Sequence, residues 1–159
     1  MSAVMGRLDS GLIQPEFSTM QFGDLDAVMA IERRIYEFPW TRGNFEDSLT
    51  SGYGAWLMRE GASLIGYAVM MLVLDEAHLL NISIIPERQR SGMGSAMLNH
   101  LLDYAVEHGV VRMLLEVRPS NVSGLAFYKH HGFVQVGERP GYYPARHGRE
   151  TAWVLGRIL

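Results

Sequence analysis

The sequence predicts an α/β fold built on a single mixed sheet. Strand-like stretches alternate with helical ones, and a β-hairpin block is followed by the order β-α-β-α-β-β. This order is typical of one sheet with helices packed on it. The chain has 159 residues, of which 48% are hydrophobic and 19% are charged. That length and composition favour one globular domain with a sizeable core and argue against disorder.

The N-terminal part predicts a strand followed by a helix. Residues 1–16 show little periodicity, so we expect them to form a flexible extension ahead of the folded part. A strand is expected over Phe17–Phe22, and Asp24 is expected to cap the helix that follows. Helical spacing of apolar residues supports this helix, at Leu25, Val28, Met29, Ile31 and Ile35. It should end before Pro39, since a residue that precedes proline avoids helical geometry.

The middle of the chain predicts a second short helix and three strands. Thr41 is the expected cap of a helix over Arg42–Leu49. Glu60–Ser63 reads as a hairpin turn, and Asp75 begins the next turn. Runs of apolar residues between these turns predict strands over Ala55–Arg59, Leu64–Leu74 and His78–Ile85.

The C-terminal half alternates helix and strand. Apolar side chains at helical spacing predict a helix over Gly92–His108, and Gly109 suits the residue after its end. A strand is expected over Val111–Val117, followed by a helix that Asn121 caps and Gly132 ends. The last two strands are expected to be joined by a long loop rich in Pro, Gly, Tyr and Arg. These segments are the strands Phe133–Glu138 and Thr151–Leu155 and the loop Arg139–Glu150.

Composition excludes several classes of function. The net charge of −3 gives no general basic field, so we expect no direct binding of nucleic acid. The chain has no cysteine, which excludes disulfides, thiolate nucleophiles and cysteine zinc sites. Residues 1–16 lack the apolar core of a signal peptide, and the longest apolar run, Ala68–Leu74, is too short to span a bilayer. We therefore expect a soluble cytoplasmic protein that does not associate with membranes.

The segment Gln89-Arg90-Ser91-Gly92-Met93-Gly94 is the most informative part of the sequence. It follows an apolar strand and opens a helix, and its two glycines allow backbone N–H groups to point outward. Unpaired amides and the positive end of the helix dipole both favour a phosphate group at such a turn. Arg88 and Arg90 flank the glycines and could add charge. An ordinary glycine-containing turn is the alternative.

The residues around this turn resemble the GCN5-related N-acetyltransferases (GNAT family). The matching elements are Gln89-x-x-Gly92-x-Gly94, the preceding Ile82-Ser83-Ile84, and Asn121 followed seven residues later by Tyr128. The resemblance implies the GNAT fold, a single mixed, mostly antiparallel sheet of about six to seven strands flanked by about four helices. It also implies acetyl-coenzyme A as co-substrate, with the pyrophosphate on the turn and the pantetheine arm along the strand. The cofactor-binding residues would be Ile82, Ser83, Ile84, Gln89, Arg90, Ser91, Gly92, Met93, Gly94, Ser95 and Asn121.

Within that family, the chain is most similar to the RimI-type ribosomal-protein alanine N-acetyltransferases. The similarity extends over residues 17–159, which we expect to form a single N-acetyltransferase domain. It rests on these segments: Phe38-Pro39-Trp40, Leu80-Asn81-Ile82, Leu115-Glu116-Val117-Arg118, Ser120-Asn121, Gly132-Phe133, Tyr142-Tyr143-Pro144 and Gly148-Arg149-Glu150. The resemblance implies that the substrate is the N-terminal alanine of the eighteenth small-subunit ribosomal protein. Some relatives act on other protein N-termini or on lysine. We expect a monomer or weak dimer.

By this resemblance Glu116 is the proton acceptor and Tyr128 the proton donor. Glu116 lies inside an apolar strand, where partial desolvation would make it a better base. An ion pair with Arg112 or Arg118 is the structural alternative for its carboxylate. A phenol is a weaker acid than a thiol, so Tyr128 is expected to hydrogen-bond the departing thiolate and transfer its proton as the bond breaks. A half-buried packing role is the alternative for Tyr128.

Four aromatic residues are candidates for the substrate-binding slot: Phe38, Trp40, Tyr142 and Tyr143. Rigid aromatic side chains offer contact area at a low entropic cost. The alternatives are core packing for Phe38 and Trp40 and a packed surface loop for the two tyrosines. The six histidines show no metal-ligand spacing, so we expect no metal.

Three other functions compete with peptide acetylation. A dinucleotide-binding oxidoreductase would share Gly92 and Gly94, but Met97 stands at the third glycine position and the chain is short for two nucleotide-binding halves. A non-catalytic coenzyme-A sensor would bind acetyl-coenzyme A and release no thiol. The same fold acting on a small amine, such as a polyamine or aminoglycoside, would carry more acidic residues around the acceptor slot.

Overall fold

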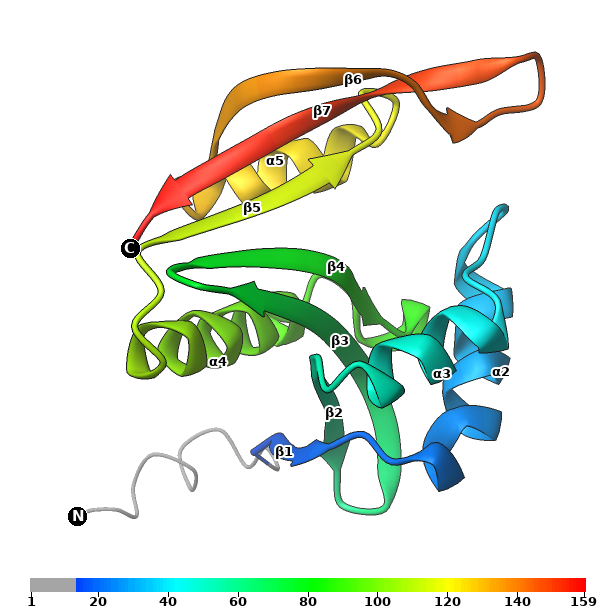
Figure 1. Cartoon of the computed structure of the whole chain (residues 1–159). Helices are drawn as coiled ribbons and strands as arrows, with labels where there is room; N and C mark the ends of the chain where they lie inside the picture. Colours follow the sequence, from blue (N-terminus) through cyan, green and yellow to red (C-terminus); the bar gives the residue numbers. More distant parts are fainter. Residues whose placement is uncertain (1–13) are drawn as a thin grey trace. The chain divides into compact units, whose positions relative to one another are not determined.

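The computed structural model describes residues 14–159 and has the expected mixed α/β architecture (Figure 1). Its sheet has seven strands in the order β1-β2-β3-β4-β5-β7-β6. The pairs β1–β2, β5–β7 and β6–β7 are antiparallel, whereas β4 and β5 are parallel. The predicted fold class, including the mostly antiparallel sheet and its flanking helices, is therefore confirmed.

The strands and helices alternate along the chain much as the sequence predicts. The strands are β1 (Glu16–Thr19), β2 (Gly54–Glu60), β3 (Ser63–Val73), β4 (Glu76–Ile84), β5 (Arg112–Val117), β6 (Val134–Pro144) and β7 (Arg149–Ile158). The helices are α2 (Leu25–Ile35), α3 (Arg42–Thr50), α4 (Met93–Glu107) and α5 (Val122–His130). Two short 3-10 turns, η1 (Phe22–Asp24) and η2 (Pro86–Arg88), complete the order.

Backbone contacts divide the chain into two compact units. The first contains the residues through Ala68 together with Ile82–Leu98, and the second contains Val69–Asn81 together with Asn99–Leu159. The flexible extension was expected over residues 1–16, and residues 1–13 of it lie outside the described part of the chain. Glu16, at its end, already pairs with Arg59 in the sheet. No helix within residues 14–159 is both long and apolar enough to cross a membrane.

In the first unit, buried apolar side chains and a capping residue explain helices α2 and α3. Leu25, Val28 and Met29 of α2 are buried, and α3 packs against α2 and β2. Thr41 caps α3 as predicted, because its Oγ1 accepts the Asn44 N–H at 3.1 Å. Asp24 is the N-cap residue of α2 as predicted, but its side chain makes no capping hydrogen bond to that helix. Its carboxylate accepts the Gln21 N–H at 2.8 Å, so it closes the preceding turn η1 instead.

In the second unit, β5, β7 and β6 lie side by side with α5 alongside them (Figure 1). Met113, Leu115 and Val117 of β5 are buried, as the alternating pattern of a strand requires. Asn121 caps α5 as predicted, because its Oδ1 accepts the Gly124 N–H at 3.0 Å.

The expected loop over Arg139–Glu150 is wrong, because most of it is strand. β6 continues to Pro144 and β7 begins at Arg149, which leaves a turn of only 145–148. Register shifts interrupt the pairing between Gln135 and Gly137 and between Arg139 and Tyr143. Such bulges explain why the sequence lacks a clean alternating pattern there. The hairpin extends past the end of β5 in Figure 1.

A close approach between β3 and β4 yields the first prediction. A Cβ added at Gly66 would lie 2.7 Å from the Ser83 carbonyl oxygen and 2.7 Å from Ile84 Cδ1, so Gly66→Ala forces the two strands apart. We expect the free energy of unfolding to fall by about 1–3 kcal/mol, the usual range for overpacking. Urea unfolding followed by circular dichroism measures the change.

Gly137→Ala is the matched control, since its added Cβ would meet nothing nearer than Val154 Cβ at 3.9 Å. The free energy of unfolding of this variant should lie within about 0.5 kcal/mol of the wild type, because the added methyl group makes only an ordinary van der Waals contact. Equal stability of the two variants would contradict the close approach.

Candidate active site

The turn that precedes α4, in the first unit, has the geometry of an anion-binding turn. Arg90 and Gly92 have φ values of 61° and 86°, both in the left-handed region. The Ala96 N–H donates to the Gly92 carbonyl at 3.0 Å. The amides of Met93 and Gly94 precede this bond, so helix geometry gives them no acceptor within α4. These amides and the positive end of the helix dipole favour an anion at the turn.

Side chains hold this turn against the rest of the first unit. Gln89 Nε2 donates to the Ile84 carbonyl at 3.0 Å, and Ser91 Oγ donates to the Arg88 carbonyl. The Arg88 guanidinium forms an ion pair with Glu60 at 2.6 Å, and both side chains are mostly shielded from solvent. Arg88 is therefore engaged with a carboxylate and contributes to anchoring the turn rather than to its charge.

The end of α2 is tied to β4 and η2. The Tyr36 hydroxyl lies 2.6 Å from Ser83 Oγ and donates to the Ile82 carbonyl at 3.3 Å. Burial raises the pKa of Tyr36 to about 12, so its hydroxyl keeps its proton at neutral pH. Arg34 binds both carboxylate oxygens of Glu87, at 2.8 and 2.9 Å, and holds the pKa of Glu87 below its usual range. These contacts fix the strand segment expected to meet the pantetheine arm.

A buried carboxylate holds the loop between α2 and α3. Glu32 is only 1% exposed, and it accepts the Tyr67 hydroxyl at 2.7 Å and the Trp40 N–H at 2.8 Å. Burial, followed by the hydrogen bond to Glu32, raises the pKa of Tyr67 far above its usual range. The Trp40 ring lies 4.9 Å from the ring of Phe45, whereas Phe38 remains 39% exposed. Trp40 therefore packs partly into the core, and Phe38 is the more accessible aromatic of this loop.

Glu116, in the second unit, lies in a hydrogen-bonded position within β5. Its side chain is 8% exposed, and its two carboxylate oxygens lie 2.8 and 2.9 Å from His78 Nε2. Arg139 Nε lies 3.6 Å from Oε2. An ionised carboxylate can only accept hydrogen bonds, so His78 Nε2 carries the proton in this arrangement. The carboxylate is thus shielded from water yet supplied with donors.

The two arginines considered as partners of Glu116 bind other carboxylates. Arg112 pairs with Glu76 at 2.6 Å, and Arg118 pairs with Glu150 at 3.2 Å. The salt-bridge contacts of Glu116 are with His78 and Arg139. This arrangement leaves Glu116 between an imidazole and the more distant guanidinium of Arg139.

Tyr142 and Tyr143 lie on β6 rather than on a loop. The Arg118 guanidinium stacks 4.3 Å from the centre of the Tyr143 ring, and Arg149 donates to the Tyr142 carbonyl at 3.0 Å. Burial and the neighbouring Glu116 carboxylate raise the pKa of Tyr143 above its usual range. Tyr143 is therefore a neutral, half-buried ring near Glu116, and Tyr142 is 43% exposed.

Asn121 and Tyr128 both belong to α5 and its cap. Asn121 uses its side-chain oxygen to cap the helix, and a Cβ added at Gly124 would lie 2.4 Å from its Nδ2. The Tyr128 ring packs 5.2 Å from Phe127 and 5.7 Å from Phe133. The cap interpretation of Asn121 is confirmed, and Tyr128 has aromatic packing partners on two sides.

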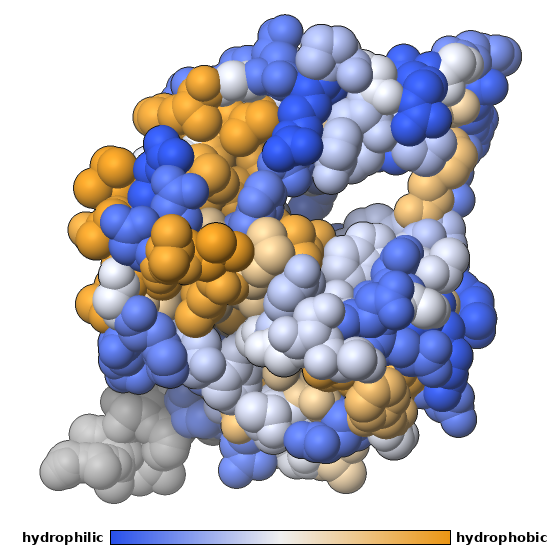
Figure 2. Space-filling view, in the orientation of Figure 1, coloured by the Kyte–Doolittle hydropathy of each residue, from blue (hydrophilic) through white to orange (hydrophobic). Residues whose placement is uncertain are grey.

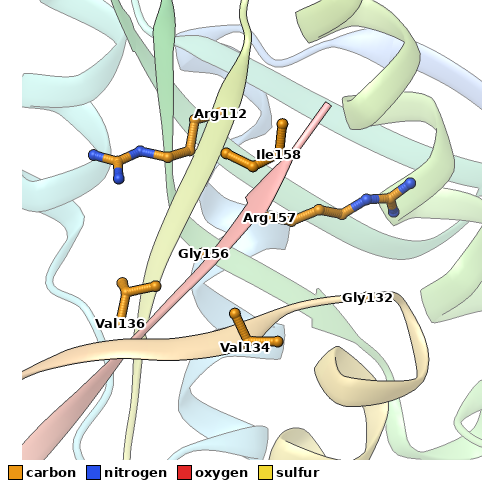
Figure 3. A pocket seen from close by; sticks show the side chains of 7 residues that line it. All are labelled: Arg112, Gly132, Val134, Val136, Gly156, Arg157 and Ile158. Atoms are coloured by element: carbon orange, nitrogen blue, oxygen red, sulfur yellow. The ribbon is translucent and has the colours of Figure 1, made fainter.

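An apolar depression in the second unit lies away from these residues. Figure 3 shows it between Arg112, Val134, Val136, Arg157 and Ile158, near the start of β5, whereas Glu116 lies near the other end of that strand. Exposed valine and isoleucine side chains surround it near the C-terminus (Figure 2). Arg112 binds Glu76 and Arg157 donates to the His131 carbonyl, so both guanidinium groups already have protein acceptors. Within residues 14–159, no cluster of histidine and acidic side chains has the arrangement of a metal site.

Comparison with known proteins identifies the family. The model of the acetyltransferase (GNAT) family matches residues 25–133. The chain belongs to this family. It is 37% identical to the ribosomal protein bS18-alanine N-acetyltransferase of Escherichia coli, over 87% of this chain and 93% of that protein. It is 36% identical to the enzyme of the same name from Haemophilus influenzae, over 89% of this chain and 97% of that protein.

A solved structure agrees with these sequence matches. The crystal structure of the ribosomal-protein-S18-alanine N-acetyltransferase from Escherichia coli superposes with a TM-score of 0.85 and 35% sequence identity. The alignment covers 91% of this chain and 94% of that one. GNAT acetyltransferases use acetyl-coenzyme A, so the expected co-substrate is supported. Membership of this family also removes the oxidoreductase alternative.

Sequence reasoning did not single out Glu32 in the first unit, or His78 and Arg139 in the second, as partners of candidate residues. His78 and Glu116 occupy neighbouring strands, and their meeting depends on the β4–β5 register, which pairs His78 with Leu114. Leu114 and Glu116 lie two residues apart and share a face of the sheet. The sequence does show a histidine and a glutamate in two strands that turn out to be adjacent and parallel. The register that brings their side chains together cannot be predicted from either strand segment alone.

The left-handed backbone of the turn supplies the second prediction. Gly92→Ala places an L side chain at a φ of 86°, although nothing lies within 4 Å of its added Cβ. Such a conformation costs roughly 1–2 kcal/mol, so the turn should relax and acetyl-coenzyme A should bind about tenfold more weakly. Isothermal titration calorimetry measures this affinity. Gly43→Ala, at an ordinary helical position, should leave it unchanged, and equal affinity of all three proteins would contradict the assignment of the turn.

Proposed function

We propose that this GNAT enzyme is a protein N-α-acetyltransferase. It transfers the acetyl group of acetyl-coenzyme A to the N-terminal alanine amine of ribosomal protein bS18, in a direct ternary-complex reaction. The names of the relatives from Escherichia coli and Haemophilus influenzae support the substrate. A cytoplasmic location and a single catalytic domain over residues 17–159 belong to the same proposal.

The observation that carries this proposal is the position of Glu116. Its carboxylate is 8% exposed and hydrogen-bonded to His78, so it is accessible to a partner without being fully solvated. An α-amine has a reference pKa near 8, and roughly a tenth of it is neutral at pH 7. A lysine amine near 10.4 is about 0.04% neutral at the same pH. One carboxylate is therefore a sufficient base for an N-terminal amine.

The reaction follows from these groups. Glu116 accepts a proton of the α-amine, whose lone pair forms the new bond to the thioester carbonyl carbon. As the carbon–sulfur bond breaks, Tyr128 hydrogen-bonds the leaving thiolate and transfers its proton to it. Because a thiol is a stronger acid than a phenol, this transfer is complete only when the Tyr128 phenolate regains a proton from solvent. The chain contains no cysteine to carry the acetyl group, which favours direct transfer over an acyl-cysteine intermediate.

The pyrophosphate and the pantetheine arm of the co-substrate are assigned to segments of the first unit. The amides at the start of α4 would bind the pyrophosphate, with Gln89, Arg90, Ser91, Gly92, Met93, Gly94 and Ser95 forming the turn. The segment Ile82–Ile84 would pair with the pantetheine arm. Tyr36 donates to the Ile82 carbonyl and Gln89 to that of Ile84, so two side chains of the first unit hold this segment in place. Asn121 would complete the cofactor-binding set.

Aromatic side chains are the candidates for contact with the peptide. Phe38 and Tyr142 are the more exposed candidates, with 39% and 43% exposure, while Trp40 and Tyr143 are partly buried. Arg118 and Arg149 hold the β6 backbone that carries the tyrosines. Acceptance of other protein N-termini, lysine or a small amine is the alternative substrate range, and a coenzyme-A sensor without turnover is the alternative of another class.

A peptide panel tests the substrate directly. Peptides with the bS18 N-terminus, the same sequence with a different first residue, and an N-blocked peptide with one lysine are incubated with acetyl-coenzyme A and analysed by mass spectrometry. We expect acetylation at the alanine amine and little at lysine. Preferred acetylation of lysine would contradict the proposal, and binding of acetyl-coenzyme A without thiol release would support the sensor.

Glu116→Gln tests the base. The glutamine keeps the size and the acceptor oxygen for His78 but cannot take a proton, so kcat should fall by about 10²–10⁴-fold while acetyl-coenzyme A affinity changes little. An assay of thiol release measures kcat, and isothermal titration calorimetry measures the affinity for acetyl-coenzyme A. Glu76→Gln removes a carboxylate that is 43% exposed and paired with Arg112, and it should retain most of the activity. An active Glu116→Gln variant would remove the base assignment.

A further inference from the structure

We propose that His78 is the positioning residue for Glu116. Its Nε2–H donates to the carboxylate and fixes the direction in which that carboxylate meets the substrate amine. The inference rests on the proposed role of Glu116 as base and deepens it. His78 touches neither the thioester nor the amine in this assignment, so its effect on the reaction passes through Glu116.

The sheet itself sets this pair. The register of β4 with β5 places His78 opposite Leu114 and Glu76 opposite Arg112. Side chains alternate between the faces of a strand, so Glu76 and His78 share a face with Arg112 and Glu116. Two cross-strand polar pairs follow on that face, Glu76 with Arg112 at 2.6 Å and His78 with Glu116 at 2.8 Å. Two strands of a hydrogen-bonded sheet thus bring the imidazole and the carboxylate together.

His78 is better suited to orient Glu116 than the other charged groups around it. Arg139 is 53% exposed and lies 3.6 Å from Oε2, beyond the length of a good hydrogen bond, in a strand interrupted by a register shift. Tyr143 also faces Glu116, and its raised pKa keeps it neutral. His78 is 20% exposed and contacts both carboxylate oxygens within 2.9 Å. A short, shielded contact from a regular strand constrains a side chain more than a longer, exposed one.

The hydrogen bond has a consequence for the chemistry. The Nε2–H donor lies near both carboxylate oxygens and occupies one side of the group, so the remaining lone pairs are held in a fixed direction. A base held in a productive direction reacts faster than one that samples several rotamers. The imidazole needs no change of charge for this role, because donation by Nε2–H is what orients the carboxylate. Loss of His78 should therefore lower kcat more than it alters the binding of either substrate.

Two substitutions at His78 separate donation from packing. His78→Gln places an amide N–H near the position of Nε2, whereas His78→Leu fills similar space without a donor. We expect His78→Gln to keep kcat within about threefold of wild type and His78→Leu to lose about tenfold or more, with KM for peptide and for acetyl-coenzyme A changing less than threefold. Equal loss in both variants, or a loss confined to KM for the peptide, would overturn the proposal.

Nuclear magnetic resonance of the substrate-free protein gives a readout independent of activity. In ¹⁵N-labelled wild type, the His78 ring should be held as the Nε2–H tautomer, and this preference should weaken in Glu116→Leu, which removes the acceptor. An unchanged tautomer in Glu116→Leu would overturn the pairing even if His78→Leu fails to fold. If the tautomer responds but no peptide is acetylated by wild type, the positioning contact stands and the proposed substrate fails. If peptides are acetylated and the tautomer does not respond, only the positioning role fails.

Discussion

The fold depends on hydrogen bonds donated to carboxylates that are largely shielded from water. Glu32 in the first unit is 1% exposed, and the side chain of Glu116 in the second is 8% exposed. An unpaired carboxylate in such places would destabilise the fold by several kcal/mol or lose its charge. Each is paired with groups from neighbouring segments: a tyrosine hydroxyl and a backbone amide for Glu32, and an imidazole for Glu116.

The hydrogen-bond partners of these two carboxylates differ. Glu32 receives two short bonds within the core, from Tyr67 and from the Trp40 amide, so it holds the α2–α3 loop at one position. Glu116 receives its short bonds from one imidazole nitrogen, which leaves acceptor capacity on the carboxylate. The donors of Glu32 thus join two separate segments of the first unit, whereas the short contacts of Glu116 come from a single side chain.

The sequence predicted the parts of the fold that depend on local patterns. Caps such as Thr41 and Asn121, and the left-handed glycines after helices, are local features and were placed correctly. The arm over Arg139–Glu150 was not, because bulges break its alternation and proline and glycine are more usual in loops. Asp24 was placed correctly as the N-cap residue of α2, but its carboxylate accepts from the Gln21 N–H of the preceding turn, which the sequence did not indicate.

Prediction of the candidate site had a similar limit. The glycine turn and Glu116 were visible in the sequence, because a spacing motif and a charge inside an apolar strand can be read from one segment each. His78 was passed over as one of six histidines without metal spacing. Its position beside Glu116 depends on how two strands are aligned, and strand register is set by the whole sheet rather than by either strand alone.

The pairing of charges near Glu116 bears on how an N-terminal ammonium group would be attracted. Arg112 neutralises Glu76, and Arg118 neutralises Glu150, whose pKa is held below its usual range by hydrogen bonds from Ser120 and by that guanidinium. At a distance the opposite charges of each ion pair cancel, so these pairs contribute little to the attraction of a charged substrate. In the proposed reaction, Glu116 would therefore both attract the positive amine at short range and deprotonate it.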